Sequence, residues 1–422
     1  MVLCLILIAA KILEKTAAAA AGAVLTILLG FVSAKDIFDF HGAVHWDAVV
    51  LIFSMFVLVE CLTHTGFFTL IGEKVLAITR FHPVAIFVVF SVVSAILAAF
   101  MDSITVMIFM AKLTYEVTKV IKISPVPFVI AQITSANIGG AATMVGDPPN
   151  VIIGTSLGYS FLDFVFNTGP VALIALVLNI TLFYLYYRSD ITSVHYNRRE
   201  FARLYRYLHP PASRKVRDFK KLVMMCCVFL GTIVLLVLHG PLSIPVSLAG
   251  FIGASVALLL GGKTAEESIK KIDWSTLVFF IGLFIIVGGL QNTGVTSDIA
   301  SALADIAGGK NLIVIILVIW ISFIVSSIVD NVPFASAMVP VIKDISSSAG
   351  IPLPTLAWSL ALGCDIGGNS TPIGASANVV ALSTLDECGR KVSWAEYCKS
   401  AIPITVAVMT LITVLVVVFY EY

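Results

Sequence analysis

The sequence contains one pattern of residues twice, at a constant spacing of 228 positions. The stretch "WDAVVLIF" begins at Trp46, and "WSTLVFFI" begins at Trp274. The same spacing relates further pairs, namely Asp102 and Asp330, Thr143 and Thr371, Gly146 and Gly374, Asn150 and Asn378, and the "IGG" triplets at 138–140 and 366–368. A spacing held without gaps at unusual polar positions indicates a structural repeat. We predict a first repeat over 1–187, a linker over 188–221 and a second repeat over 222–422.

The composition is typical of a membrane protein. Hydrophobic residues make up 59% of the chain and charged residues 12%, and the mean hydropathy of +1.04 exceeds that of soluble globular proteins. These values predict an all-α polytopic membrane protein. The net charge of +1 favours no nucleic-acid partner. No GxxxxGK[ST] motif indicates an ATP-binding domain, so any energising ATPase would be a separate partner.

Matching apolar segments can be placed in both copies. They cover 1–11, 16–33, 47–64, 84–117, 125–157 and 167–187 in the first repeat, and 222–240, 244–262, 275–292, 311–349, 354–386 and 399–420 in the second. Segment 1–11 is too short for a span, which needs about 20 residues, whereas its counterpart is full length. We expect either a native start upstream of Met1 or a half-length first helix.

The basic linker predicts the orientation in the membrane. Ten Lys and Arg residues lie in 188–221, so the positive-inside rule places this loop in the cytoplasm. Polar breaks within 84–117 and 311–349 favour re-entrant hairpins over spans. Each repeat then crosses five times, which predicts that the second is inverted relative to the first. This layout puts 23 of the 26 Lys and Arg residues on the cytoplasmic side of a plasma-membrane protein.

Each repeat interrupts its helices twice, and these breaks are where we expect a site. The hairpin tips read "FMDSIT" at 100–105 and "IVDNVP" at 328–333, and the broken helices read "SANIGGAATMVGDPPN" at 135–150 and "GCDIGGNSTPIGASAN" at 363–378. Unwound backbone in hydrocarbon is tolerated only where it is buried in protein or lines a wet cavity. The freed carbonyls and the Asn, Ser and Thr side chains can coordinate an ion or solute.

The candidate binding residues follow from these breaks. They are Asp102, Ser103, Asn137, Gly139, Gly140, Thr143, Asp147, Asn150, Asp330, Asn331, Asp365, Gly367, Gly368, Asn369, Thr371 and Asn378. A bound sodium ion would use Asp102, Asn137, Asn150, Asn331 and Asn378. We expect no cofactor other than such an ion or a coupled proton.

The four breaks carry four aspartates and no basic side chain. A carboxylate at membrane depth is energetically expensive and by default functional. Asp102 and Asp330 occupy equivalent positions and could instead cap the hairpin arms that follow them. Asp147 and Asp365 have no charged equivalent at the 228 spacing. We expect this inequality to suit a proton or sodium site better than a scaffold.

The same motifs resemble a known group of transporters. "NIGGAATMVGDPPNVIIGTS", "VDNVPFASAMVPVI" and "IGGNSTPIGASANVVAL" resemble the ion transporter superfamily, most closely its branch of arsenite permeases, NhaD-type sodium/proton antiporters and the melanosomal P protein, with a citrate transporter-like domain. The resemblance covers nearly the whole chain. It implies a homodimer in which a transport domain moves against a fixed scaffold by elevator-like alternating access. Asp147 departs from the related divalent anion:sodium symporters, which carry Ser there.

The four aspartates of the breaks, which have no basic side chain beside them in the sequence, favour some substrates over others. We expect proton-coupled efflux of arsenite or antimonite first, sodium/proton antiport second, and sodium-coupled transport of di- or tricarboxylates such as citrate third, because an anion needs a positive environment. Arsenous acid is neutral and could exchange hydrogen bonds with Asn137, Asn150, Asn369, Thr371 and Asn378. A channel and an intramembrane aspartyl protease are disfavoured, since paired broken helices are typical of alternating access. We predict a secondary transporter and not an enzyme.

Overall fold

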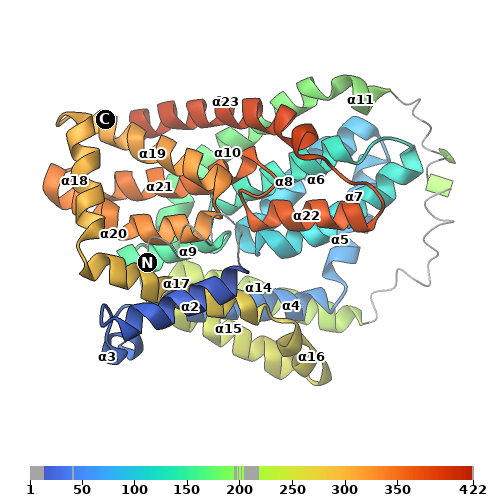
Figure 1. The fold of residues 1–422 in the computed structure, drawn as a ribbon. Coiled ribbons are helices and arrows are strands. Elements are labelled where there is room, and N and C mark those ends of the chain that lie inside the picture. Colours follow the sequence, from blue (N-terminus) through green and yellow to red (C-terminus); the bar gives the residue numbers. More distant parts are fainter. Residues whose placement is uncertain are drawn as a thin grey trace.

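The computed structural model describes residues 14–39, 42–193, 197, 199–200, 202–203 and 218–420. The predicted first segment, 1–11, and most of the predicted linker, 188–221, lie outside these residues. Within the described part the chain is built from helices and short turns (Figure 1).

The helices of the first half follow the predicted segments and add three short ones. They are α2 (Lys15–Leu28), α3 (Ala34–Phe38), α4 (Trp46–Thr63), α5 (Phe67–Thr79), α6 (Pro83–Phe100), α7 (Ser103–Ile121), α8 (Val126–Gly140), α9 (Pro148–Leu157), α10 (Phe161–Tyr186) and α11 (Arg188–Thr192). The predicted hairpin 84–117 is the pair α6 and α7, and the predicted broken helix 125–157 is the pair α8 and α9. The sequence analysis did not predict α3, α5 or α11.

The second half contains the counterparts. They are α14 (Phe219–Leu238), α15 (Val246–Gly261), α16 (Lys263–Lys271), α17 (Trp274–Asn292), α18 (Val295–Ala307), α19 (Asn311–Ile328), α20 (Asn331–Ala349), α21 (Leu353–Gly367), η1 (Gly368–Ser370), α22 (Ser376–Glu387) and α23 (Trp394–Tyr420). Helices α17, α18, α19, α20 and α22 begin 228 positions after α4, α5, α6, α7 and α9. The boundaries of the helices therefore repeat with the sequence.

The unpredicted pair α5 and α18 shows how closely the two halves agree. Each helix connects a long span to a hairpin, and each is preceded by a glycine in the left-handed region, with φ of 84° at Gly66 and 80° at Gly294. A side chain at such a φ would strain the backbone, so glycine is needed at both turns.

Seven helices of the described part are long and apolar enough to cross a bilayer: α4, α6, α10, α14, α17, α19 and most of α23. Helices α2 and α15 are apolar but shorter. The predicted class, an all-α polytopic membrane protein, is thereby confirmed. The set includes α6 and α19, the first arms of the two hairpins, and the depth at which the hairpins turn stays a prediction, as do the crossings and the inversion.

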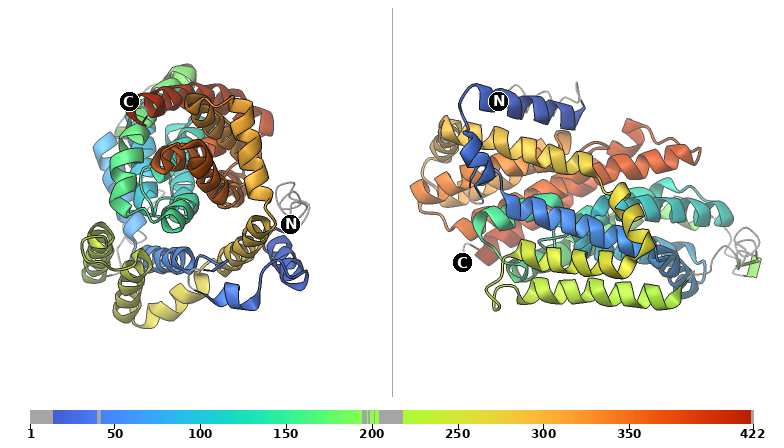
Figure 2. Two further views of the ribbon diagram at one scale, coloured as in Figure 1. Left: turned by 90° about the vertical axis from the view of Figure 1, so that its left-hand side faces the viewer. Right: turned by 90° about the horizontal axis from the view of Figure 1, so that it is seen from below.

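The helices form two layers, which Figure 2 shows end-on and from below. In the first, which we call the scaffold layer, α2 packs against α17 and α4 against α15, with α14 and α16 beside them. The second, which we call the hairpin layer, contains α6 to α10 and α19 to α23. Within it α6 packs against α8 and α19 packs against α21. The first arm of each hairpin therefore contacts the broken helix of its own repeat.

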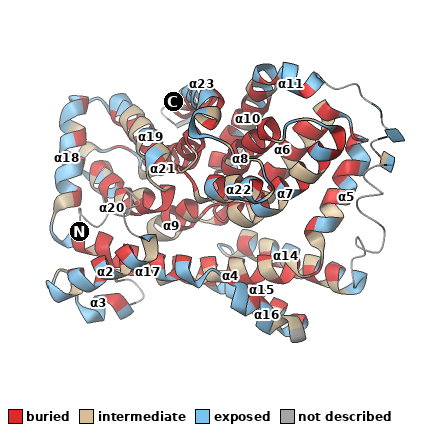
Figure 3. Ribbon diagram, turned by 45° about the vertical axis from the view of Figure 1, so that its right-hand side comes forward, coloured by how far each residue is buried: buried red, intermediate tan, exposed pale blue. Residues whose placement is uncertain are grey.

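The broken helices lie at the centre of the hairpin layer, where burial is greatest (Figure 3). Every residue of α8 is buried. A Cβ at Gly139 would lie 2.1 Å from the Ala95 carbonyl oxygen, and a Cβ at Gly367 would lie 2.6 Å from that of Phe323. Only glycine lets the first hairpin arm approach the broken helix this closely.

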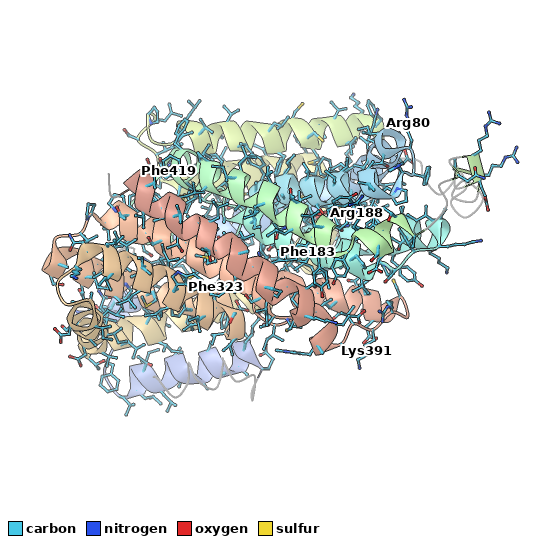
Figure 4. All side chains as sticks on the ribbon, turned by 90° about the horizontal axis from the view of Figure 1, so that it is seen from above. Arg80, Phe183, Arg188, Phe323, Lys391 and Phe419 are labelled. Atoms are coloured by element: carbon cyan, nitrogen blue, oxygen red, sulfur yellow. The ribbon has the colours of Figure 1, made fainter. Side chains whose placement is uncertain are left out.

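Several basic residues lie together at one end of the molecule. Figure 4 places Arg80, Arg188 and Lys391 at one end and Phe419 at the other. Helices α5 and α18 lie at opposite ends (Figure 1), which is the placement that an inverted pair of repeats requires. The positive-inside rule predicts that the basic end is cytoplasmic.

Candidate functional site

The two hairpin tips meet beside the breaks that begin α9 and α22. A cavity of about 30 Å³ lies between them, which is about the volume that one water occupies in the liquid. Five of the predicted residues line it: Asp102, Ser103, Asp147, Asp330 and Asn331. The structure therefore brings both tips and one broken helix to a single small site.

Asp147 is held between equivalent residues of the two tips. The Ser103 hydroxyl donates to Asp147 Oδ1 at 3.2 Å, and Asn331 Nδ2 donates to Asp147 Oδ2 at 2.7 Å. Ser103 and Asn331 are the first residues of α7 and α20. Asp147 occupies the N-cap position of α9, yet its side chain makes no capping hydrogen bond. Its carboxylate is thus positioned by the tips rather than by its own helix.

A second carboxyl group adjoins the first. Asp365, near the end of α21, is 0% exposed. Asn331 Nδ2 lies 3.5 Å from Asp365 Oδ1, and the two carboxyl groups interact directly. The two acids without charged equivalents therefore lie side by side and share one amide. The repeat spacing alone did not predict this pairing, because the two residues come from different breaks.

Asp102 and Asp330 cap the hairpin arms, as the alternative interpretation predicted. Asp102 Oδ2 accepts from the Thr105 N–H at 3.1 Å, and Asp330 Oδ1 accepts from the Val332 N–H at 3.3 Å. Both side chains also line the cavity. Asp102 Oδ1 is buried and has no hydrogen-bond partner among the described groups. Capping and a role in the cavity therefore coexist.

Two residues beside Asp330 were missed by the sequence analysis. The Ser376 hydroxyl donates to Asp330 Oδ2 at 3.0 Å, and Lys15 Nζ lies 4.0 Å from the same oxygen. Ser376 lies within the "IGASAN" motif, which could have drawn attention to it. Lys15 comes from α2 in the scaffold layer, and no sequence signal linked it to the second hairpin.

The asparagines of the breaks hold the unwound backbone. Asn150 and Asn378 each donate Nδ2 to two carbonyl groups that the break frees from the helix. The acceptors are Gly140 (3.0 Å) and Thr143 (3.2 Å) in the first repeat, and Gly368 (2.7 Å) and Thr371 (2.8 Å) in the second. We call these two amides the asparagine braces. They satisfy buried carbonyls that would otherwise be costly.

The predicted threonines and glycines of the breaks contact the backbone of neighbouring segments. The hydroxyls of Thr143 and Thr371 donate to the carbonyls of Ala99 and Ser327, which stand at equivalent places in the hairpin arms. The predicted glycines allow close packing. None of the predicted glycines or threonines is among the described residues that line the cavity.

A polar contact joins the two repeats behind the cavity. Asn137 Nδ2 donates to Asn369 Oδ1 at 2.8 Å and to Asn378 Oδ1 at 3.0 Å. The Tyr397 hydroxyl donates to the Asn369 carbonyl at 3.0 Å. The predicted residues Asn137, Asn369 and Asn378 thus connect the repeats instead of facing the cavity. A sodium site on the five predicted residues stays a prediction, and the hydrogen bonds described here are enough to account for the positions of its four asparagines.

Two vestibules flank the site and are related by the repeat. One, of about 510 Å³, lies beside α4 and α7, and the other, of about 200 Å³, lies beside α17 and α20. The equivalent residues Phe56 and Phe284 line one vestibule each. The larger vestibule shares Phe56, Asp102 and Ile104 with the cavity, whereas the smaller shares none of the cavity's described lining. The site therefore adjoins one side of the protein more closely than the other.

The vestibules also differ in their titratable groups. The larger contains Glu60, whose Oε1 lies 3.6 Å from Lys271 Nζ and 3.3 Å from His64 Nε2. The smaller contains His45 and Lys343. Burial, and then the charge of Lys343, lower the pKa of His45 to about 4. His45 is therefore neutral at physiological pH.

Paired hairpin tips, paired broken helices and a small acidic site between two vestibules define a secondary membrane transporter. Residues 4–363 match the family model described as citrate transporter. The chain belongs to this family, which confirms the predicted resemblance to the ion transporter superfamily.

Relatives of known sequence and structure agree with this assignment. The chain is 33% identical over 413 residues to the "46 kDa membrane protein" of Mycobacterium leprae, covering 95% of this chain and 92% of that protein. It is 27% identical over 484 residues to the P protein of Homo sapiens, of which it covers 57%.

Two solved structures share the fold. The Alcanivorax borkumensis YdaH transporter superposes with a TM-score of 0.62 at 12% identity, over 97% of this chain and 98% of that one. Neisseria gonorrhoeae MtrF, described as illuminating a class of antimetabolite efflux pumps, gives 0.64 at 11% identity, over 94% and 84%.

Proposed function

We propose that this transporter couples the movement of a small inorganic solute to protons, with arsenite or antimonite efflux as the first candidate. The observation that carries the proposal is the cavity between the hairpin tips, which is small and lined by Asp102, Asp147 and Asp330. A solute accepted there is small, and the three carboxyl groups outnumber the one basic side chain of the described lining, Lys15, which disfavours an anion. A neutral hydroxylated solute such as arsenous acid meets the charge condition and is much smaller than citrate, although the tips must separate to admit it as well.

Protons provide the coupling in this proposal. Asp147 and Asp365 are buried beside each other, and two adjacent carboxylates in low dielectric cannot both remain charged at low cost. Proton uptake and release at this pair therefore changes the charge of the site by one unit. Asn331, which contacts both acids, connects that change to the hairpin tip.

Citrate is the second candidate, and the description of the matching family favours it. The three acids of the cavity outnumber Lys15 and would repel a citrate anion, so this function requires an accompanying cation. The solute would also need the tips to separate, because the cavity has the volume of about one water. Sodium/proton antiport, which uses the same acids without an organic substrate, is the third candidate.

The proposed transport cycle is an elevator-like movement of the hairpin layer against the scaffold layer of a plasma-membrane homodimer. The site adjoins the larger vestibule, which contains Lys112 and Lys271. With the basic end of the molecule assigned to the cytoplasm, this conformation is the one that opens inward.

Proteoliposomes with an internal pH dye test the function directly. Arsenite, citrate and sodium are added separately on each side of the membrane, with empty liposomes as the control. Proton movement with arsenite alone supports the first candidate. Movement only with citrate, or only with sodium, selects the second or third, and a response to none of the three contradicts the proposal.

A further inference from the structure

The two asparagine braces differ in what their oxygens contact. Asn378 Oδ1 accepts a hydrogen bond from Asn137 Nδ2 at 3.0 Å. Asn150 Oδ1, at the equivalent position, is buried without a hydrogen-bond partner among the described groups. The repeat explains the difference, because Asp365 stands where the other repeat has Asn137.

Asp365 is a neighbour of Asn150. Its side chain is in contact with that of Asn150, and its Oδ2 is likewise buried without a partner. Both residues are 0% exposed. Because Asn150 Nδ2 donates to the two carbonyls of the brace, neither unpartnered oxygen has a donor among the described groups, whereas the equivalent residues Asn137 and Asn378 form a hydrogen bond. Two buried acceptors without a donor are costly.

The described groups that interact with Asp365 include no positive charge. Of the α-helices that pack against α21, α8, α9 and α19 contain no charged residue. The other three carry charged residues: Asp163 in α10, Lys343 and Asp344 in α20, and Glu396 and Lys399 in α23. The titratable groups that face Asp365 are Asp147, from the first break, and the neighbouring thiol of Cys364. Asn331 and Asn150 contribute uncharged amides. An ionised Asp365 would therefore be a second buried negative charge beside Asp147.

We propose that Asp365 is the proton-carrying group of the transporter and that Asn150 is the acceptor for its proton. A proton delivered by water binds Asp365 Oδ2, the new O–H donates to Asn150 Oδ1, and the reverse transfer returns the proton to water. This bond reproduces in the first repeat the Asn137-to-Asn378 bond of the second. The inference deepens the proposed proton coupling and rests on it.

The geometry also relates the proton to the solute cavity. Asn331 Nδ2 lies 2.7 Å from Asp147 and 3.5 Å from Asp365. Ionisation of Asp365 attracts this amide away from Asp147, and protonation releases it. Because Asn331 begins the second hairpin arm, the protonation state of Asp365 acts on the tip that closes the cavity.

Infrared difference spectroscopy of the purified full chain in lipid nanodiscs tests the inference without a substrate. A pH titration reads the carbonyl-stretch band of a protonated carboxylic acid. The expected result is a band in the wild type that Asp365→Asn removes and Asp163→Asn, a matched change in the capping box of α10, retains. A band that persists in Asp365→Asn overturns the inference, as does one displaced by sodium at constant pH.

Paired variants of the braces separate proton binding from folding. Asn150→Ala should shift the frequency of the band, because the acceptor of the O–H is lost, whereas Asn378→Ala should leave it in place. Each change removes the two hydrogen bonds that the asparagine Nδ2 donates to carbonyls of its own break. A difference between the two spectra therefore cannot come from the loss of these bonds. Equal shifts would contradict the assignment.

A swap variant covers the case in which Asp365→Asn misfolds. N137D/D365N exchanges the acid and amide between the repeats and should restore a titrating band, now with Asn378 as acceptor. No band in a folded swap variant would contradict the inference. The dye assay is separate: if the band belongs to Asp365 but no added solute moves protons, the proposed function fails and the proton site stands.

Discussion

The two broken helices share a frame and differ in their acids. In both, an asparagine brace holds the freed carbonyls and a threonine hydroxyl bonds the hairpin arm. Yet the first carries Asp147 where the second has Ala375, and the second carries Asp365 where the first has Asn137. The comparison teaches that the repeat duplicates the scaffold of the site, and the chemistry lies where the copies disagree.

The contacts of Asp147 explain why its position is not duplicated. Its carboxylate receives hydrogen bonds from Ser103 and Asn331, which are equivalent residues of the two tips. A group that contacts two equivalent positions lies close to the axis that relates the repeats. A second acid at Ala375 would compete for the same place and add a like charge, so the repeat can hold one such group.

The largest expected effect comes from replacing Asp147, the acid of the first broken helix whose equivalent in the second is Ala375. Asp147→Asn keeps the shape of the side chain but loses its charge and an acceptor for Asn331. Charge-assisted hydrogen bonds contribute about 1.5–3 kcal/mol, so we expect coupled transport to fall by at least about tenfold. Initial rates in the pH-dye proteoliposomes measure it.

The control for this change is Asp163→Asn, which alters an acid outside the cavity. It should transport like the wild type. If Asp147→Asn kept the wild-type rate and pH dependence, the difference between Asp147 and its equivalent Ala375 would have no role in transport.

Gly139→Ala and Gly367→Ala test the shared frame. The added Cβ would lie 2.1 Å or 2.6 Å from a backbone carbonyl oxygen, so the hairpin arm must move. Overpacking of this kind costs about 1–3 kcal/mol or more, and both variants should lose folded protein in size-exclusion profiles, Gly139→Ala the more severely.

Gly231→Ala provides the matched control, because a Cβ there meets open space within α14. It should be neutral or stabilising. If either core variant matched Gly231→Ala in yield and melting temperature, the close approach of hairpin and broken helix would be wrong in that repeat.

Much of this frame could be predicted from the sequence, because polar residues and glycines in apolar segments recur at a fixed spacing. The hairpins, both broken helices and the cavity residues Asp102, Asp147 and Asn331 were found in this way. Helices α5 and α18 were missed because they are short and amphipathic rather than uniformly apolar. The contact between Asp147 and Asp365 was missed because it depends on how two breaks pack together, which spacing along the chain does not contain.

A smaller effect is expected where the two breaks make the same bond. Thr143→Val and Thr371→Val each remove one hydroxyl that donates to a hairpin carbonyl. Each should cost about 1 kcal/mol and lower the melting temperature by about 1 °C. Thermal unfolding in detergent measures both, with Thr410→Val on the exposed face of α23 as the control. A large difference between the two core variants would mean that the frames are unequal as well as the acids.

The smallest effect concerns His45, whose equivalent in the larger vestibule is Asp273. The pKa of His45 is lowered to about 4 in the fold, below its unfolded value of about 6.5. As pH falls through that window the unfolded state binds a proton that the native state refuses, so stability is lost. Between about pH 7 and pH 5, the melting temperature of His45→Gln should therefore fall less than that of the wild type. The difference between the two decreases should be a few degrees at most. Its transport should keep the wild-type pH dependence near neutrality, since His45 is already neutral there. If His45→Gln shifted the pH dependence of transport, proton coupling would belong to the smaller vestibule. There would then be no reason to assign it to Asp147 and Asp365.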